Sequence, residues 1–270
     1  MSKPIKIGII GTKFMGRAHS KAFIDAPHFF DLPLQPVLRA ACGVDEAATL
    51  SFAKRFGWET TEKSYERLVA RDDIDLVDIC TSNVTHMPMA LAAAKAGKHI
   101  LCEKPLAMNA DEARRMLDAA NTAGVRHMVA FNYRRVPAIA FARQMIEAGK
   151  IGKVYHFNAV YLQDWLVDPN SAFSWRGDAR LAGSGAHGDL NAHIIDLARY
   201  LVGDVAAVSA AQETFVKERP LTGGQGKAKV TVDDAMLFMA RFQNGGLGSF
   251  MATRFATGRK NMLRLEIFGS

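Results

Sequence analysis

Cysteine is scarce in this sequence, which has three among its 270 residues, Cys42, Cys80 and Cys102. Their number is odd and none of them forms a CxxC pair, so a disulfide scaffold and a cysteine-rich zinc module are excluded. Each lies at or near the end of an apolar run, where a thiol packs as a small hydrophobic group. We therefore expect a cytoplasmic protein in a reducing compartment.

Long hydrophobic runs are also lacking. The apolar stretch Met89–Ala94 stops at Lys95, well short of the ~20 residues that a membrane span needs. The first residues, Met1-Ser-Lys-Pro4, lead straight into a strand pattern rather than into a signal peptide. We therefore expect no membrane partner.

Charge is not concentrated anywhere in the chain. The formal net charge is +7, but lysine and arginine form no basic run and are not interleaved with aromatic residues. This pattern indicates a solvated surface rather than a nucleic-acid-binding one, so no nucleic acid partner is expected. With 49% hydrophobic and 23% charged residues, the composition is typical of a globular protein with one large or two ordinary domains.

The first half of the chain alternates short apolar runs with helical patterns. This order predicts an α/β domain, a doubly wound parallel sheet with helices on both faces. The expected strands are Ile5–Ile10, Leu38–Val44, Leu76–Cys80, His99–Cys102 and His127–Ala130. Asn109 and Glu112 predict the start of a helix that Gly124 ends. The stretch Pro27–Pro33 indicates a packed loop.

The second half changes period after Gly149. Val154–Tyr161 alternates as a strand does, and three later segments and a final one also favour strands: Ala206–Lys217, Asp234–Gln243, Leu247–Ala256 and Leu263–Phe268. Asn244-Gly245 predicts a tight hairpin turn with two residues of positive φ. We therefore expect an α+β domain with an open, largely antiparallel sheet, and assign residues 1–135 and 136–270 to the two domains.

A glycine motif, Gly8-Ile-Ile-Gly11-Thr-Lys-Phe-Met-Gly16, lies between the first strand and the first helix. Glycines there let backbone N–H groups and a helix N-terminus approach a pyrophosphate. A merely structural glycine turn is the alternative, since Lys13 replaces the middle glycine of GxGxxG. Gly43 aligns with the acidic residue expected after the second strand, which leaves Asp45 as a turn candidate and the choice between NAD and NADP open.

Two further segments carry residues suited to proton transfer. Cys102-Glu-Lys-Pro105 follows a predicted strand, so Lys104 faces the ligand edge of a parallel sheet, unless it is an ordinary surface lysine. The glycine-rich stretch from Gly183 leads into a helix on which Asp189 and His193 share one face, with Asp196 close behind. An ordinary ion pair, or a metal site with His187, are the alternatives; we expect no metal.

These motifs together resemble the Gfo/Idh/MocA oxidoreductase family, over essentially the whole chain. The resemblance is carried by the glycine motif, Thr81–His86, Glu103-Lys-Pro105, Asn132–Arg135, and Asp189 with His193, in that order and spacing. It implies a Rossmann domain followed by an open-faced β-sheet domain, a nicotinamide cofactor, and a sugar or cyclic polyol as substrate. It also implies a cis peptide bond before Pro105.

The resemblance implies roles for individual residues. Lys104, Asp189 and His193 are the implied catalytic residues. The expected NAD or NADP contacts are Gly11, Thr12, Lys13, Phe14, Met15, Gly16, Asp45, Thr81, Ser82, Asn83, His86, Glu103 and Lys104. The expected substrate contacts are Tyr133, Asp164, Trp175, Arg176, Asp189 and His193.

The expected reaction is hydride transfer between the nicotinamide and a secondary hydroxyl or ketone. An NAD-dependent glycosidase using transient oxidation, and an inactive dinucleotide-binding fragment, remain alternatives. Members of the family usually continue well past Leu263–Phe268, so the resemblance implies that part of the second sheet is missing. We expect a homo-oligomer formed through that sheet.

Overall fold

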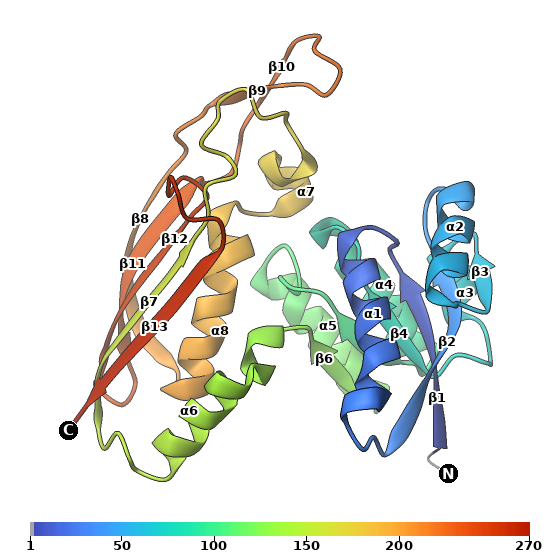
Figure 1. Cartoon of the computed structure of the whole chain (residues 1–270), viewed down its shortest axis with the longest axis horizontal. Helices are drawn as coiled ribbons and strands as arrows, with labels where there is room; N and C mark the ends of the chain where they lie inside the picture. Colours follow the sequence, from blue (N-terminus) through green and yellow to red (C-terminus); the bar gives the residue numbers. More distant parts are fainter. Residues whose placement is uncertain (1–2) are drawn as a thin grey trace. The chain divides into compact units, whose positions relative to one another are not determined.

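The computed structural model describes residues 3–270 and separates into two compact units (Figure 1). The first reaches Ala130 and the second runs from Phe131 to Ser270. Among the described residues, no helix combines the length and the apolar character that crossing a membrane requires.

The first unit is built on a six-stranded parallel sheet in the order β3-β2-β1-β4-β5-β6. Its strands are β1 (Lys3–Ile10), β2 (Leu34–Cys42), β3 (Thr60–Glu62), β4 (Leu76–Ile79), β5 (His99–Cys102) and β6 (His127–Val129). Its helices are α1 (Phe14–Phe29), α2 (Glu46–Phe56), α3 (Tyr65–Val69), α4 (His86–Lys95) and α5 (Ala110–Thr122). The predicted doubly wound domain is confirmed.

The strand order explains where a ligand site can form in this unit. The chain builds outward from β1 to β3 and then resumes at β4, on the other side of β1. At such a reversal the loops after the two central strands diverge, which is where doubly wound folds bind ligands. The central strands bury apolar side chains on both faces, with Ile7, Ile9, Val77 and Ile79 almost fully buried.

Local capping chemistry sets several helix ends as predicted. The Asn109 side chain accepts a hydrogen bond from the Glu112 N–H at 2.9 Å, and Gly124 has a φ of 65° just after α5. The Glu112 carboxylate reaches back to the N–H of Met108 at 3.1 Å. These reciprocal bonds satisfy helix N–H groups that have no partner within the helix.

The packed loop predicted for Pro27–Pro33 is wrong for residues 27–29, which are helical, and only residues 30–33 form a connection. Helix α1 continues through Pro27 to Phe29, and β2 already begins at Leu34. The last turn still closes, because the N–H of Phe30 donates to the carbonyl of Ala26 at 3.0 Å. Phe29 and Phe30 are largely exposed rather than packed. Local proline content therefore misled the prediction, because a proline near a helix end removes only one intrahelical bond.

The second unit is an α+β arrangement around a five-stranded sheet in the order β13-β7-β12-β11-β8. Its strands are β7 (Val154–Leu162), β8 (Val205–Glu213), β11 (Ala235–Phe242), β12 (Leu247–Thr253) and β13 (Met262–Gly269), with a separate pair, β9 (Glu218–Pro220) and β10 (Lys227–Lys229). Its helices are α6 (Pro137–Glu147), α7 (Ala179–Ala182) and α8 (Ala192–Leu201). The sheet is largely antiparallel, as predicted, with one parallel pair between β12 and β7.

One face of this sheet packs against helix α8. Alternate residues of β7, among them Phe157, Ala159 and Tyr161, belong to the same buried cluster as Ile194 and Ala198 of the helix. Figure 1 shows α6 and α8 on the same side of the sheet. A sheet with one packed face needs this period-two alternation. The packing therefore fixes which strand residues point toward α8.

The hairpin between β11 and β12 differs from the prediction in its turn. Of the expected positive-φ pair only Gly245 has a positive φ, at 91°, and Asn244 does not. The Asn244 side chain instead accepts a hydrogen bond from the N–H of Gly246 at 3.1 Å. The last paired residues of the two strands are Arg241 and Leu247, so the connection between them is longer than the two-residue turn expected. A side chain that mimics a backbone turn explains the difference.

Candidate active site

The glycine motif forms a close turn between β1 and α1. The N–H of Gly11 donates to the carbonyl of Cys42 at 2.9 Å, and its φ is 109°. A Cβ at Gly11 would lie 2.4 Å from the carbonyl oxygen of Cys80, and one at Gly16 would lie 2.0 Å from that of Gly11. Side chains at these two positions are therefore excluded by the backbone itself, which keeps the start of α1 close to the strand ends.

The N-terminus of α1 is open to a ligand. Lys13 is its N-cap residue, has no side-chain capping bond, and is followed by a first turn without acidic residues. Phe14 is 79% exposed, and Thr12 and Met15 are half-buried beside it. The first N–H groups of a 16-residue helix carry partial positive charge, and the lysine adds a full one. The arrangement suits an anionic group such as a pyrophosphate.

The loop after β2 places an acid beside the glycine turn. Asp45 caps α2, with its side chain accepting the N–H of Ala48 at 2.8 Å. Gly43 lies against this turn, because a Cβ there would meet the Thr49 hydroxyl at 2.5 Å and the Thr12 side chain at 3.1 Å. The turn role anticipated for Asp45 is thus confirmed, and its exposed carboxylate stays at the carboxyl end of β2.

The loop after β4 is tied together by its own hydroxyl groups. The Thr85 hydroxyl donates to the Thr81 hydroxyl and lies equally close, at 2.7 Å, to the carbonyl of Ser82. Asn83 is buried at the start of a short 3₁₀ turn (Asn83–Thr85). This loop follows the strand next to β1, so it shares the ligand edge of the sheet with the glycine turn.

The loop after β5 carries Lys104 and is held from two sides. Glu103 is buried, and its Oε2 accepts the N–H of Lys104 at 2.9 Å. The ring of His86, fully buried, lies 3.0 Å from the carbonyl of Pro105 and 3.2 Å from that of Thr81. Burial lowers the pKa of this imidazole, although its backbone hydrogen bonds act in the opposite direction. The predicted cis peptide bond between Lys104 and Pro105 is present.

In the second unit, His193 lies on the first turn of α8 inside an aromatic enclosure. Its ring centroid is 4.7 Å from that of Tyr133, 5.8 Å from that of Tyr161 and 6.1 Å from that of Phe131. The hydroxyls of Tyr133 and Tyr161 hydrogen-bond to each other at 2.8 Å. Burial, together with that bond, raises the pKa of Tyr161, so its phenol stays neutral. The imidazole is thereby enclosed by aromatic rings.

Asp189 is fixed by an arginine that the sequence analysis did not select. Arg254 is 1% exposed, and its Nη2 donates to Asp189 Oδ2 at 2.9 Å. The same nitrogen lies 3.3 Å from the carbonyl of Gly185, and the guanidinium stacks 5.3 Å from the ring centre of Trp165. The Asp189 side chain keeps 26% exposure. A carboxylate held by a buried guanidinium and still partly exposed can accept a hydrogen bond from a hydroxyl.

The glycine-rich segment before α8 is shaped by Asp233. Its two carboxylate oxygens accept the N–H groups of Gly185 and His187, each at 2.7 Å. A Cβ at Gly185 would lie 1.8 Å from the carbonyl oxygen of Asp233, so the two backbones are in direct contact. This contact starts a π-helical turn over His187–Asn191 that contains Asp189. A π-helical turn at this place is typical of functional sites.

Asp196 of α8 is bound by Arg134. Its carboxylate forms a paired ion bridge with Arg134, at 2.6 and 2.5 Å, and is 8% exposed. The Arg134 guanidinium also lies 5.0 Å from the ring centre of Tyr200. Asp196 therefore connects the short turn around Tyr133 to α8.

The alternative metal set of His187, Asp189 and His193 is not among the groups that residues 3–270 bring within metal-binding reach.

The other expected substrate residues lie in loops of the second unit. Asp164 accepts hydrogen bonds from Lys260 Nζ at 3.0 Å and from the N–H of Gly258 at 3.1 Å. The hydrogen bond with Lys260 holds the pKa of this carboxyl below its usual value. Trp175 and Arg176 form a cation–π pair in the 3₁₀ turn Trp175–Gly177, 4.6 Å apart. The contacts of Tyr133 place it beside His193, whereas those of Asp164 and Trp175 are with other loop residues.

Sequence reasoning missed Arg254, Tyr161 and Trp165. Arg254 carries a usable signal, because it is a lone charge within the apolar run Phe250–Ala256. A charged residue is rarely fully buried unless it is paired, so such a position indicates a buried ion pair. Tyr161 could be found from its strand, where it shares a face with Phe157 and Ala159. Trp165 lies in an irregular segment and gives no comparable signal.

The fold and these loops define a dinucleotide-binding oxidoreductase whose second unit is built on a sheet. Residues 5–131 match the family model described as an oxidoreductase family with an NAD-binding Rossmann fold. Residues 139–270 match the model of the GFO/IDH/MocA C-terminal domain. The chain therefore belongs to the Gfo/Idh/MocA family of NAD-binding oxidoreductases.

Three similar proteins illustrate this membership. A levoglucosan dehydrogenase of Pseudarthrobacter phenanthrenivorans is 46% identical over 98% of this chain and 72% of that protein. The crystal structure of an oxidoreductase domain protein from Kribbella flavida has a TM-score of 0.97 at 53% identity, over 100% of this chain and 73% of that one. A levoglucosan dehydrogenase complex with NADH and levoglucosan has a TM-score of 0.96 at 46% identity, over 99% and 72%. Named relatives of this chain are thus sugar dehydrogenases.

Proposed function

We propose that this protein is an NAD-dependent dehydrogenase that oxidises a secondary hydroxyl of a sugar, with levoglucosan as the first substrate to test. One observation carries the proposal: a buried imidazole, His193, lies among aromatic rings on the same short segment as an arginine-bound carboxylate, Asp189. A base beside a hydroxyl-binding anion is what alcohol oxidation requires of a protein. The levoglucosan dehydrogenases among its relatives support the choice of sugar.

The cofactor site is supported by the turn at Gly11 and Gly16, where a Cβ would strike backbone carbonyls. When bound, NAD⁺ supplies the hydride acceptor. The chain's own contribution is the uncapped start of α1 with Lys13, together with Thr12, Phe14 and Met15 around it. We favour NAD over NADP, because the exposed carboxylate of Asp45 at the end of β2 would repel a 2′-phosphate. The Thr81, Ser82 and Asn83 loop and the Glu103 loop complete this edge.

The proposed role of each side chain follows from its surroundings. His193 takes the hydroxyl proton as hydride leaves the carbinol carbon, because a positioned imidazole can act as a general base toward a hydroxyl. Asp189, held by Arg254, accepts a hydrogen bond from a neighbouring sugar hydroxyl. Lys104 polarises the reacting oxygen, or takes the proton in place of His193. Tyr133 supplies an apolar face, while Asp164, Trp175 and Arg176 are proposed to border the sugar.

The first experiment follows the reduction of NAD⁺ by its absorbance with a panel of sugars and cyclic polyols. We expect turnover with levoglucosan or a related pyranose, and a higher kcat/KM with NAD⁺ than with NADP⁺. Calorimetric titration with NADH provides an independent test of the cofactor site. Saturable NADH binding without turnover on any member of the panel would reject the proposed substrate class, and no NADH binding would reject the whole proposal.

The second experiment replaces the proposed proton-transfer groups. Lys104→Ala and His193→Ala are each expected to lower kcat by about 10²-fold or more, the usual effect of removing a positioned acid or base. Lys95→Ala and His127→Ala are matched controls, because both side chains are exposed and lie outside the site. Retention of wild-type kcat by either site variant would remove that residue from the mechanism.

A further inference from the structure

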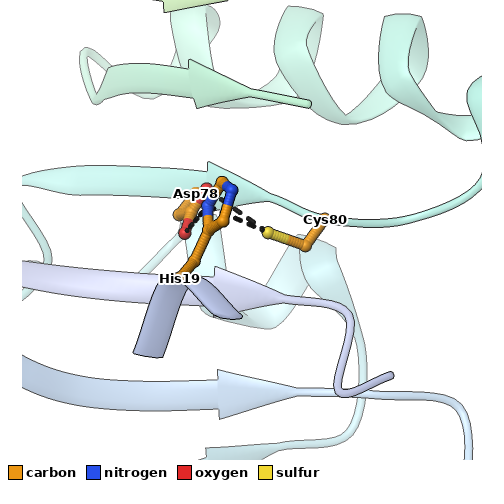
Figure 2. Close-up of side chains that lie close together, drawn as sticks. All are labelled: His19, Asp78 and Cys80. Carbon is orange, nitrogen blue, oxygen red and sulfur yellow. Dashed lines mark hydrogen bonds and ion pairs between the residues drawn. The ribbon is translucent and has the colours of Figure 1, made fainter. Parts of the chain in front are cut away.

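Beneath the loop that carries Lys104 lies a chain of buried ionisable groups. His19 on α1 lies between Asp78 of β4 and Glu103 after β5. Its Nδ1 is 2.9 and 3.0 Å from the two Asp78 oxygens, and its Nε2 is 3.0 Å from Glu103 Oε1. Figure 2 shows the His19 ring reaching from the helix toward Asp78, with the Cys80 thiol beside it. Three elements far apart in sequence thus meet at one imidazole.

The charges of these groups make the arrangement specific. Burial alone would lower the pKa of His19, but its hydrogen bonds to Asp78 and Glu103 and their charges outweigh burial and raise it to about 10. Both ring nitrogens therefore carry protons, and each donates to a carboxylate. Asp78 is completely buried, which raises the pKa of its carboxyl, and the cation of His19 opposes that rise. A cation held between two anions has few alternative positions.

The chain of groups continues beyond Glu103 into the backbone of the proposed catalytic loop. The oxygen of Glu103 that does not face His19, Oε2, accepts the N–H of Lys104 at 2.9 Å. His19 thus fixes one oxygen of the carboxylate while the other fixes the backbone of Lys104. Any rotation of the Glu103 side chain would break both bonds together.

A metal site is the competing interpretation of this cluster. His19, Asp78 and Cys80 form the group that residues 3–270 bring within metal-binding reach. Their geometry fits hydrogen bonding, because the 2.9 Å between His19 Nδ1 and Asp78 Oδ2 is the length of a charge-assisted N–H···O bond. Burial also raises the pKa of Cys80 well above its usual value, so the thiol stays protonated and lies within reach of Asp78 Oδ1, at 3.5 Å. Thiolate is the form that binds zinc.

We infer that Asp78, His19 and Glu103 form a positioning relay that fixes the backbone of Lys104 for catalysis. This inference rests on the proposed function, in which Lys104 acts on the reacting oxygen. Asp78 and His19 are assigned no contact with substrate or cofactor, and Glu103, an expected cofactor contact, is the member that bonds to the Lys104 loop. They act through the hydrogen bond from the Lys104 N–H to Glu103, and errors of about 1 Å in such a position can cost roughly 10²-fold in rate.

The test is a double-mutant cycle between His19→Gln and Lys104→Ala, on the full chain. In the wild-type background, His19→Gln is expected to lower kcat about 10-fold or more, with the Kd of NADH and the KM of the sugar changing less than about threefold. In the Lys104→Ala background the same change is expected to have almost no effect on the residual kcat, because the group being positioned is absent. Equal losses in both backgrounds would overturn the relay.

Ser20→Ala is the matched control for a loss of packing. Ser20 is the buried neighbour of His19 on α1, and its hydroxyl bonds to the carbonyl of Gly16 and to Trp58 without reaching the Lys104 loop. Ser20→Ala should lower Tm. The ratio of kcat between the protein with Lys104 and the protein with Lys104→Ala should be the same with and without Ser20→Ala. Asp78→Asn provides a second variant with the same shape and no charge, and it should reproduce part of the His19→Gln loss in kcat.

Two results separate the possible failures. If Lys104→Ala itself keeps wild-type kcat, Lys104 has no role in the mechanism and the relay is overturned, whereas the proposed dehydrogenase activity is tested separately by the reduction of NAD⁺ with the sugar panel. Elemental analysis of the purified protein should find no stoichiometric zinc that depends on His19. A zinc ion retained by the wild type and lost in His19→Gln would overturn the relay, because the three side chains would then be metal ligands.

Discussion

At the scale of single residues, the second unit depends on a buried charge whose partner faces the proposed substrate. Arg254 is 1% exposed, whereas Asp189 keeps a quarter of its surface. The pair is therefore asymmetric: the cation is enclosed and the anion is reachable. Such an arrangement keeps a carboxylate charged and oriented without removing it from a ligand.

Arg254→Met should consequently reduce both stability and activity. Loss of a hydrogen bond to a charged group costs about 1.5–3 kcal/mol, so kcat/KM for the sugar should fall at least about 10-fold. Arg254→Lys should recover part of this loss, because it restores the charge but not the planar donor. Steady-state kinetics and thermal unfolding measure the two effects. The control is Arg264→Met, because Arg264 is exposed and its partner Glu266 lies on the sheet edge strand; if it matched the loss in Arg254→Met, the proposed role of Asp189 would fail.

The residue scale also shows what a sequence can and cannot reveal. Lys104, Asp189 and His193 were selected because their spacing follows a known motif, and the structure gives each of them structured surroundings. In the second unit, Arg254 contacts Asp189 and Tyr161 lies beside His193. Arg254 follows the end of β12 and Tyr161 lies on β7, so only tertiary packing brings them to these residues. Contacts made by tertiary packing leave a weak trace in local sequence. The ion pair of Asp196 with Arg134 leaves no local trace for the same reason, since Arg134 lies 62 positions away.

At the scale of elements, the turn between β1 and α1 decides whether a dinucleotide can approach. Gly16 is required by contact, because the added Cβ would lie 2.0 Å from the Gly11 carbonyl oxygen. Gly57, after α2, is required only by its φ of 78°, since nothing lies within 4 Å of an added Cβ. Substitutions at the two glycines therefore distinguish a requirement for space, at Gly16, from a requirement for backbone conformation, at Gly57.

Gly16→Ala should push α1 away from the strand ends and weaken NADH binding by at least about 10-fold, because the helix N-terminus must reach the pyrophosphate. Gly57→Ala should lower stability by about 1 kcal/mol, the cost of the left-handed conformation, and leave NADH binding unchanged. Calorimetric titration and thermal unfolding of both variants check this difference. If Gly16→Ala bound NADH as tightly as the wild type, the glycine turn would be structural only.

Element prediction succeeded where one signal dominated. The five strands of the parallel sheet that were predicted are all present, because an uninterrupted apolar run bounded by helices is hard to mistake. The short β3 was missed, since three residues, Thr60–Glu62, carry no usable pattern. Pro27 and Asn244 were misread because each has two possible uses, and only the surrounding hydrogen bonds decide between them.

At the scale of the whole molecule, the face of the second sheet opposite α8 remains apolar. Leu237 is 46% exposed and Met239 is 66% exposed on β11, and paired neighbours on the same face include Met251 and Ala211. Figure 1 shows no helix of this unit on that side of the sheet. Apolar patches of this kind on a sheet are typical of association surfaces. The same period-two pattern that predicted the sheet therefore also predicts a partner for it.

We propose that the partner is a second copy of this chain, because the same patch can pair with itself across a two-fold axis. Sedimentation velocity of the wild type should show a concentration-dependent dimer or larger assembly. Met239→Lys should shift the assembly toward the monomer, because the lysine would place an unpaired charge in the centre of the contact.

Phe29→Lys is the matched control: that side chain is 76% exposed on α1, outside the sheet. NADH affinity should be unchanged in both variants, since neither Met239 nor Phe29 belongs to the glycine turn. A wild-type protein that stays monomeric at every concentration, or a Met239→Lys variant that assembles like the wild type, would show that this face is not the contact.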